Sequence, residues 1–541
     1  MKMWPVIISA EEQILALKQA LAERDEALRL EREQRQALTG ELRVTRTERD
    51  LLKERLNKFL RKLFEARSEA LVNQKDMFFN EAEAEGAAAQ PVEEEPADEL
   101  TIDIPAHKRK THRGRKPLDP ALPREVVRHE LPEAERVCPH DGSALKEIGV
   151  EASEQLDIIP QQVRVIRHER VKYACPCCDG AIRLAARPAQ IIARGLLTEA
   201  AQAWVVTAKY DDGMPLYRIA ALMARFGGSC FNRNTLAATV IKLGQGVQPL
   251  FNLMKDRLLD SCVVHGDETH LQVLKEPGRA AQSKSWLWAQ STEHSGIDGT
   301  GPPIRLYTYT TGRGAQAGAS IWAGVREGAV LMSDGYEVYN EIAQTQRLTH
   351  LACWAHCRRY WMEAWQALPK ASRTREHPAT KALELIAKLY EVEKRAKEAT
   401  PEEREAIRNA DSVRLLKEIE ALVQQHQHAA LPQSALGKAL HYTASQWDKL
   451  TRYVKNGSWP IDNNACENAI RPFVVGRNGW LFSDTPAGAQ ASANLYSLLQ
   501  TCRANGVNTY DYLKALFVAL PKASTADDYE GLLPWRIRLA P

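Results

Sequence analysis

Two aspartates and one glutamate stand where they could bind divalent metal ions. Asp267 ends the apolar run 261–266, Asp334 ends the apolar run 329–333, and Glu467 follows an Asp-Asn-Asn sequence at 462–464. Mg²⁺ prefers carboxylate oxygens together with water and phosphate. Three such carboxylates could hold two ions about 4 Å apart, an arrangement that catalyses phosphodiester displacement. Each residue alone is more typical of a strand end, a turn or a solvated helix, so only the set favours a metal site.

The elements around these residues predict a mixed α/β sheet. Strands are expected at 261–269, 286–288, 305–309, 329–335 and 348–353, with a small-residue helix near 315–325 between the third and the fourth. Three strands in a meander, a crossover helix and two parallel strands would bring the first and fourth strands together. Asp267 and Asp334 would then face each other at the centre of the sheet.

A long helical segment separates Asp334 from Glu467. Residues 362 to 455 are almost entirely helical in pattern and highly charged, and the chain is expected to return to the sheet near Glu467. Asp462 or Asn463 would cap the returning helix, and Pro472 would limit its length. This pattern predicts that Glu467 sits mid-way along a short helix.

Composition and cysteine usage indicate a cytoplasmic protein. The chain has 541 residues, 44% of them hydrophobic, and a net charge of only +3, so local patches matter more than overall basicity. We find neither an apolar run long enough for a membrane span nor a secretory signal, and we expect a bacterial, nucleoid-associated location without a membrane partner. The ten cysteines are then thiols or metal ligands rather than disulfides.

The N-terminal part predicts a partner helix and a DNA contact. Residues 10–75 fit an imperfect heptad pattern with Ile14, Leu21, Leu28, Leu42, Leu56 and Leu63 at a positions and Leu17, Leu38, Leu52 and Phe59 at d positions. A dimeric coiled coil is favoured over a lone amphipathic helix folded back on the body. An acidic linker follows, and then a basic run in which Arg113, Arg115 and Lys116 could lie along the minor groove of DNA. The alternative is a merely solvated basic linker.

Two cysteine clusters predict a structural zinc module. Cys175 and Cys178 have Cys-x-x-Cys spacing, and Cys138 with His140 supplies the other two ligands, although Asp141 could replace His140. The β-rich segments 163–166 and 171–173 would form a hairpin that joins the two clusters. The alternative is a zinc-free remnant. The helical segment 191–258 fits either a helix-turn-helix or a plain helical hairpin.

The sequence resembles the DDE transposases of the insertion-sequence-66 family over essentially the whole chain, with its motifs in the same order. The matching stretches are Gly-Asp-Glu-Thr at 266–269, Asp-Gly-Tyr-Glu-Val-Tyr-Asn at 334–340, Cys-Trp-Ala-His at 353–356, Asp-Asn-Asn through Glu to Ile-Arg-Pro at 462–472, Gly-Arg-Asn at 476–478 and Trp-Leu-Phe at 480–482. The resemblance implies a ribonuclease-H-like core with a helical insertion, a zinc module and an N-terminal zipper. It assigns Asp267, Asp334 and Glu467 as the ligands of Mg²⁺ or Mn²⁺. Asp141 stands where many relatives have Cys.

Other residues near these motifs are candidates for DNA contact. Arg471 and Arg477 could bind phosphate, His356 and Arg359 could contact DNA or the scissile phosphate, and Trp480 could stack on a flipped base or pack in the core. Cys353, His356 and Cys357 are more typical of packing and surface positions on one helix than of a metal site.

The sequence predicts the following division of the chain into segments: 1–80 zipper, 81–124 linker, 125–190 zinc module, 191–258 helical DNA-binding region, 259–362 first part of the core, 363–457 insertion, 458–490 Glu helix and 491–541 helical C-terminal region.

The sequence therefore predicts a DNA transposase that cuts element ends and joins them to target DNA. Its expected partners are double-stranded DNA, a second copy of the chain and accessory proteins of the same element. The alternatives are a hydrolytic nuclease on the same fold and a non-enzymatic, zinc-dependent DNA-binding regulator.

Overall fold

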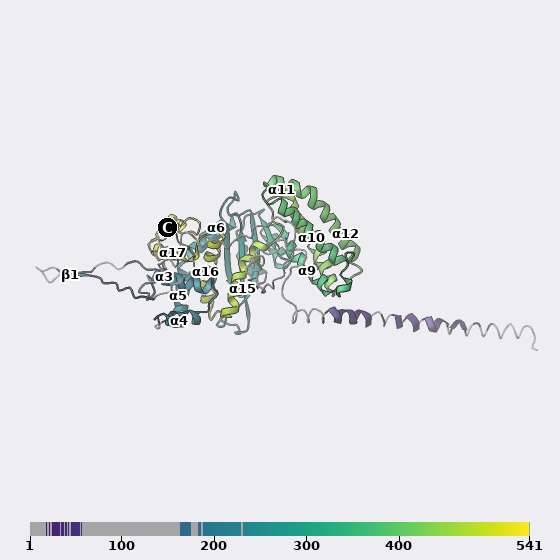
Figure 1. Ribbon diagram of the computed structural model, residues 1–541, viewed down its shortest axis with the longest axis horizontal. Coiled ribbons are helices and arrows are strands. Elements are labelled where there is room, and N and C mark those ends of the chain that lie inside the picture. Colours follow the sequence, from purple (N-terminus) through teal and green to yellow (C-terminus); the bar gives the residue numbers. More distant parts are fainter. Residues whose placement is uncertain are drawn as a thin grey trace, which may run out of the picture.

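A five-stranded mixed sheet lies at the centre of the molecule (Figure 1). This computed structural model describes residues 163–174, 182–184, 188–228 and 231–539, with separate positions between 18 and 56. The sheet has the order β5-β4-β3-β6-β7. Its strands are β3 (Val263–Gln272), β4 (Lys284–Thr292), β5 (Ile304–Thr310), β6 (Val330–Ser333) and β7 (Thr349–Ala352). Strands β3 to β5 form an antiparallel meander, and β6 and β7 run parallel to β3, as the sequence predicts.

Helices cover both faces of the sheet. On one face lie α15 (Asn464–Trp480) and α16 (Pro486–Ala504), and the Tyr307 backbone N–H of β5 donates to Ser497 Oγ of α16 at 2.9 Å. On the other face lie α7 (Ala315–Trp322) and α8 (Val338–Thr345), where Tyr339 packs edge-on against Trp288 with ring centroids 5.9 Å apart. Successive side chains of a strand point to opposite faces of the sheet, so only every second residue of β3, β4 and β5 lies on the face that α15 covers.

Between residue 188 and the sheet, the described chain forms four helices: α3 (Glu199–Tyr210), α4 (Leu216–Arg225), α5 (Arg233–Gly246) and α6 (Gln248–Leu259). The buried face of α5 packs against α16, and a Cβ atom at Gly244 would lie only 2.5 Å from Ala491 Cα. The close approach of these two helices requires glycine at this position. This packing fits the helical-hairpin alternative for the segment, while the polar residues at the start of α5 stay exposed.

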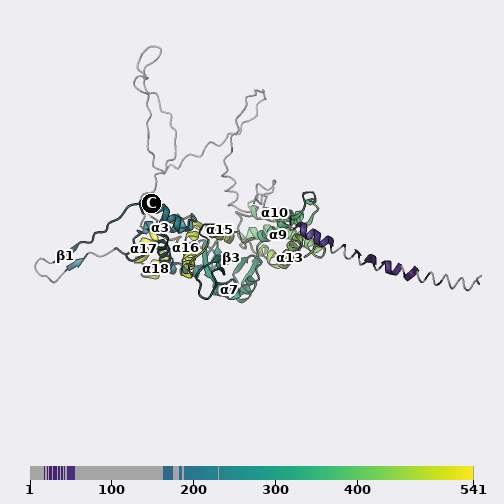
Figure 2. The same cartoon turned by 90° about the horizontal axis from the view of Figure 1, so that it is seen from below.

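The helical insertion has a hydrophobic core of its own. It consists of α9 (Trp354–Ala367), α10 (Pro378–Arg395), α11 (Pro401–Ile407), α12 (Val413–His426), α13 (Ala435–Ser445) and α14 (Trp447–Thr451). Buried apolar side chains such as Trp361, Ile386 and Ile419 form this core. Figures 1 and 2 both place the insertion on one side of the sheet, with α3, α16 and α17 (Thr509–Ala519) on the other. The last helix of the described residues is the short α18 (Ala526–Gly531).

Pro472 does not end its helix, contrary to the expectation from the sequence. Helix α15 continues through Pro472 to Trp480, and Glu467 lies in its first turn rather than half-way along. A proline removes one backbone donor and disturbs the preceding turn, which costs about 3 kcal/mol in an isolated helix. Here Ile470, Phe473 and Gly476 on the same helix are buried, so tertiary packing outweighs the local penalty.

The hairpin near the second cysteine cluster also differs from the expectation. Residues 163–171 form no strand, whereas β1 (Lys172–Ala174) pairs antiparallel with β2 (Ile182–Leu184), on the far side of that cluster. Val163, Val165 and Ile166 are exposed. A β-rich sequence forms a stable strand only when it has a neighbouring strand and a face to bury, and within the described part of the chain residues 163–171 pair with no strand.

The N-terminal zipper segment is helical at its described positions. Leu21, Leu28, Leu38, Leu42, Leu52 and Leu56, the described apolar residues of the predicted seam, are all exposed. Among the residues described by the structure, no helix combines the length and the apolar character needed to cross a bilayer.

Candidate active site

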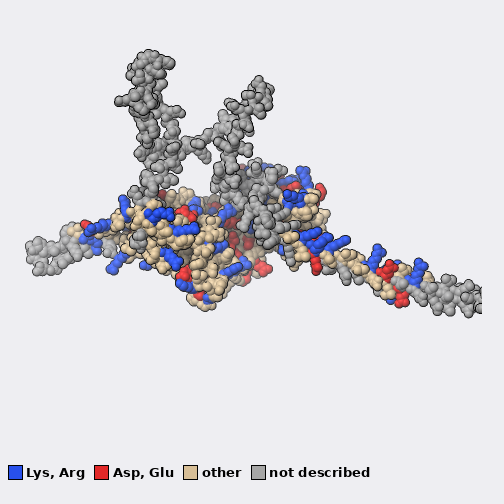
Figure 3. Space-filling model, turned by 60° about the horizontal axis from the view of Figure 1, so that its bottom comes forward, with Lys and Arg blue, Asp and Glu red and all other residues tan. Residues whose placement is uncertain are grey.

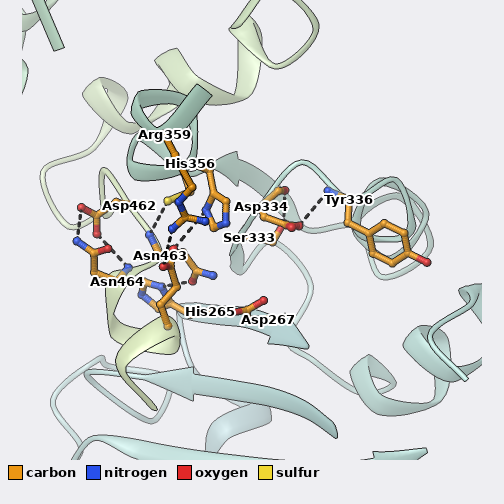
Figure 4. A network of polar contacts seen from close by, with 12 residues as sticks. His265, Asp267, Ser333, Asp334, Tyr336, His356, Arg359, Asp462, Asn463 and Asn464 are labelled. Carbon is orange, nitrogen blue, oxygen red and sulfur yellow. Dashed lines mark hydrogen bonds and ion pairs between the residues drawn. The ribbon is translucent and has the colours of Figure 1, made fainter. Parts of the chain in front are cut away.

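Asp267 lies within β3, and Asp334 directly follows the neighbouring parallel strand β6. The register pairs Val264 with Leu331 and His265 with Met332, and each aspartate lies two residues beyond that last pair. Neighbouring strands are about 4.8 Å apart, so the two backbones hold the carboxyl groups side by side at the carboxyl end of β6. The Asp334 Oδ1 atom accepts a hydrogen bond from the Tyr336 backbone N–H at 2.9 Å, which fixes the turn after β6 (Figure 4).

The environment of Asp267 disfavours a negative charge. Burial raises the pKa of this carboxyl group well above its usual value. The charges of Glu268, Asp334 and Glu467 raise the pKa further, although the Glu268 backbone N–H lowers it by donating to Asp267 Oδ1 at 2.9 Å. Carboxylates arranged in this way are stabilised by a bound cation, and their hard oxygen atoms suit Mg²⁺ or Mn²⁺. The donor set therefore fits the predicted metal.

Glu467 reaches this region from the first turn of α15. Its Oε1 atom lies 3.3 Å from Nδ1 of His356, and its Oε2 atom accepts a hydrogen bond from the Arg359 guanidinium at 3.2 Å. Both partners lie on α9, the first helix of the insertion (Figure 4). Burial lowers the pKa of His356, although the negative charge of Glu467 acts in the opposite direction. In the space-filling view, acidic side chains gather near the middle of the face, with Lys and Arg on both sides (Figure 3).

The sulfur and nitrogen atoms near Glu467 form a second possible ligand group. Within the described part of the chain, Cys353, His356 and Glu467 bring their ligand atoms within 4.8 Å of one another. Cys357 takes no part, because its Sγ atom faces Thr443 Oγ1 at 3.3 Å inside the insertion. Burial raises the pKa of the Cys353 thiol well above its usual value, so the thiolate form that binds metals best is disfavoured.

A fourth carboxylate, Glu268, lies on the opposite face of the sheet from Asp267. Tyr339 donates a hydrogen bond to Glu268 Oε2 at 2.8 Å, and the guanidinium of Arg313 lies 3.6 Å from its Oε1. Burial raises the pKa of Glu268 to about 7. Arg313 in turn lies over the rings of Trp286 and Tyr336, at 4.6 and 4.3 Å from their centroids.

The predicted DNA-contact residues on α15 have different surroundings. Arg477 donates to Thr269 Oγ1 at 3.1 Å and also to the His270 carbonyl, so it ties the helix to β3. Trp480 packs edge-on against Phe473 with centroids 5.3 Å apart, and the Lys209 ammonium lies 5.2 Å from its ring. Arg471 is half-buried on the same helix. Trp480 is therefore packed against the core in this structure, with part of its surface accessible.

Several predicted residues lie outside the described part of the chain. These are Arg113, Arg115 and Lys116 of the basic run and Cys138, His140, Asp141, Cys175 and Cys178 of the zinc module. The acidic and basic linker at 81–124 lies outside it as well.

Two buried polar residues of the site are absent from the sequence-based set. His265 precedes Asp267 by two residues on β3, so the period-two alternation of a strand places both on the face that α15 covers. Asn463 directly precedes α15 and is fully buried. The alternation along β3 could have identified His265. The Asp-Asn-Asn sequence, by contrast, suggested only a helix cap.

Four protein-family models together match most of the chain. The model described as "Transposase IS66 family" matches residues 194–491, and the "IS66 C-terminal element" matches residues 497–535. The "zinc-finger binding domain of transposase IS66" matches residues 135–179, a range that contains both predicted cysteine clusters. A fourth model, described as "Transposase C of IS166 homeodomain", matches residues 51–127, across the predicted end of the zipper and the linker.

Three uncharacterised proteins of Sinorhizobium fredii (strain NBRC 101917 / NGR234) are similar to this chain. Protein y4qI is 31% identical over 438 residues, which is 79% of either chain. Protein y4jD is 28% identical over 76% of this chain and 81% of its own length. Protein y4hP is 26% identical over 90% of this chain and 88% of its own length.

Proposed function

Because the chain belongs to the IS66 transposase family, we propose that it cleaves DNA at element ends and transfers the freed strands to target DNA, with Asp267, Asp334 and Glu467 as the catalytic carboxylates. The observation that carries this proposal is the parallel pairing of β3 with β6. That pairing brings Asp267 and Asp334 together, next to the helix that bears Glu467.

The three carboxylates would hold two Mg²⁺ or Mn²⁺ ions, which in such sites activate the attacking oxygen and stabilise the leaving oxygen. The protein supplies the placement. Strands β3 and β6 fix two of the carboxylates through the sheet, and His356 and Arg359 orient the third. Arg359 is exposed beside Glu467, and its guanidinium is suited to a phosphate oxygen of DNA.

The reaction consists of two successive displacements at phosphorus. Water attacks a phosphodiester at the element end, and the bond to the 3′ oxygen breaks, which leaves a 3′-hydroxyl. That hydroxyl then attacks a phosphodiester of the target, forms a new bond to phosphorus and releases a target 3′-hydroxyl. No covalent intermediate with the protein is required, because positioning of the two reactants carries the catalysis.

The N-terminal modules are proposed to bind the DNA and to pair two copies of the chain. Cys138, His140, Cys175 and Cys178 would bind one structural Zn²⁺, and the match at 135–179 supports a zinc module in this range. Arg113, Arg115 and Lys116 would contact the minor groove of an element end. The exposed leucines of the N-terminal helix support a coiled coil between two copies, which would bring two ends together.

A strand-transfer assay tests the catalytic proposal. The full-length protein is incubated with a labelled element-end duplex, a plasmid target and Mg²⁺, and both nicked ends and joined products are measured. Asp267→Asn, Asp334→Asn and Glu467→Gln should each lower cleavage by at least about 100-fold while DNA binding is kept. Glu341→Gln, an exposed carboxylate on α8, serves as the matched control. Nicking without joined products would instead favour a hydrolytic nuclease, and unchanged DNA-dependent activity in all three variants would favour a regulator.

A further inference from the structure

Asn463 precedes helix α15, but its side chain does not cap that helix. The capping contacts come from Asp462, whose Oδ1 accepts the Asn464 backbone N–H at 3.1 Å and whose Oδ2 accepts the Asn464 side-chain amide at 2.9 Å. The Asn463 side chain instead crosses to strand β3 (Figure 4). Its Nδ2 donates to the Gly266 carbonyl at 2.9 Å, and its Oδ1 lies 3.0 Å from Nδ1 of His265.

The backbone of Asn463 makes further contacts with elements of the site. Its N–H donates to the Cys353 Sγ atom at 3.2 Å, and its carbonyl accepts the backbone N–H groups of Cys466 and Glu467 at 3.0 and 3.1 Å. Cys353 directly precedes α9, the helix that contacts Glu467. One fully buried residue therefore joins three elements: the strand of Asp267, the helix of Glu467 and the start of α9.

We propose that Asn463 is a positioning residue that sets the separation between the carboxyl groups of Asp267 and Glu467, an inference that rests on the proposed function. Gly266, which accepts its amide proton, is the residue directly before Asp267. Glu467 lies one helical turn beyond Asn463. The hydrogen bonds of the Asn463 side chain therefore hold the backbone next to each carboxylate, and the side chain itself contacts neither carboxyl group.

The connectivity explains why such a residue is required. Between Asp334 and Glu467 the chain leaves the sheet and builds an insertion with its own core, so the sequence alone does not hold Glu467 near the strands. The chain returns at Ile461, whose carbonyl accepts the Trp354 backbone N–H at 3.2 Å. The Asn463 side chain makes hydrogen bonds to β3 directly after that point of return.

Asparagine suits this position because it offers a donor and an acceptor together. The Gly266 carbonyl accepts only, so Nδ2–H must face it. The Oδ1 atom of Asn463 lies 3.0 Å from Nδ1 of His265, and because an amide oxygen only accepts, Nδ1–H of the ring is the donor. An aspartate at 463 would direct a carboxylate oxygen at the Gly266 carbonyl, and an alanine would leave both partners without a bond.

Metal binding by the full-length protein tests this role independently of DNA cleavage. Mn²⁺ is titrated into wild type and variants, and free Mn²⁺ is measured by electron paramagnetic resonance. Asn463→Ala and Asn463→Asp should weaken Mn²⁺ binding by about 10- to 100-fold, as the loss of a residue that orients a ligand does in other metal sites. The control Asn464→Ala removes a contact to Asp462 and keeps every side-chain bond of Asn463, so its affinity should stay within about 2-fold of wild type.

Two further variants separate the possible failures. Asp267→Asn should abolish the same Mn²⁺ binding, and unchanged binding there would overturn the proposed metal site itself. Loss in Asp267→Asn with wild-type affinity in Asn463→Ala would overturn the positioning role alone. If Asn463→Ala does not fold, His265→Ala replaces it, because this change removes the partner of Oδ1 and leaves the bond to Gly266 in place. Wild-type affinity in a folded His265→Ala protein would then overturn the proposal.

Discussion

The Nδ1 atom of His356 lies 3.3 Å from the Oε1 atom of Glu467, so a helix of the insertion directly contacts the third carboxylate of the proposed site. Arg359, one turn further along α9, contacts the other oxygen of the same group at 3.2 Å. We predict that His356→Ala and Arg359→Ala each lower Mg²⁺-dependent cleavage by about 10- to 100-fold. Because both act through Glu467, the double variant should lose less than the product of the two single effects. A double-mutant cycle on cleavage rates measures this, and fully multiplicative losses would show that the two residues act independently.

The stability of the metal-free protein should fall as the pH rises. Glu268 has its pKa raised from 4.5 to about 7 in the folded protein. A group with a raised folded-state pKa contributes stability that is complete below pH 4.5 and is lost as the pH rises through about 7. Asp267, whose pKa is also raised, acts in the same direction.

Chemical denaturation in the presence of a chelator, at several values from about pH 5 to about pH 8, checks this prediction. The Glu268 contribution should not exceed about 3 kcal/mol, and Glu268→Gln should flatten the pH dependence. Saturating Mg²⁺ should remove the Asp267 part of this pH dependence, because a cation favours the ionised form of a ligand carboxylate, and should leave the Glu268 part in place. A wild-type protein that becomes more stable across this range without metal would contradict the assignment.

Gly266 should not accept a side chain. A Cβ atom there would lie 2.6 Å from Trp322 and 3.0 Å from Tyr339, two buried rings on the face opposite α15. Gly266→Ala should therefore destabilise the protein by about 1 to 3 kcal/mol and also reduce cleavage, since Asp267 is the next residue. Gly312→Ala is the control, because a Cβ atom at Gly312 would have no neighbour within 4 Å. Denaturation midpoints and cleavage rates measured on the same samples test both effects.

The exposed seam of the N-terminal helix should mediate self-association. Leu28 and Leu42, at a positions, are 43% and 56% exposed in the single chain. Changing both to Asp should weaken dimerisation by at least about 30-fold, because burying a charge at a coiled-coil seam costs about 2 kcal/mol or more. Glu26→Lys, on the far side of the same helix, should have little effect. Sedimentation equilibrium of the full chain compares the wild type, the Leu28/Leu42 double variant and Glu26→Lys. Equal dimerisation by all three proteins would rule out this seam.

The sheet and its two aspartates could be predicted because their determinants are local. An apolar run that ends on an Asp is visible in the sequence, and the order of strands and helix then restricts the topology. The length of α15 could not be predicted, because Pro472 penalises a helix locally and the burial that overrides it comes from residues distant in sequence. Asn463 was missed for a similar reason. Its type suggests a cap, whereas its bonds go to residues almost two hundred positions away.

In the segment 163–171, local propensity predicts a strand that the structure does not form. Its β-branched residues favour a strand, but they pair with no strand among the described residues, and the short strands of this region lie at 172–174 and 182–184. Propensity therefore identified the region of the hairpin and misplaced its pairing.

The insertion is closed at its base by two short contacts, from Trp354 N–H to the Ile461 carbonyl and from Asn463 N–H to Cys353 Sγ, each 3.2 Å long. Helix α9 extends from this base with its first turns at Glu467 and its later residues in the core of the insertion. Helix α9 therefore connects the hydrophobic core of the insertion with the third carboxylate. Because Glu467 itself belongs to α15, which packs on the sheet, a shift of α9 would change only the side-chain contacts that orient this carboxylate, and the two aspartates would keep their places.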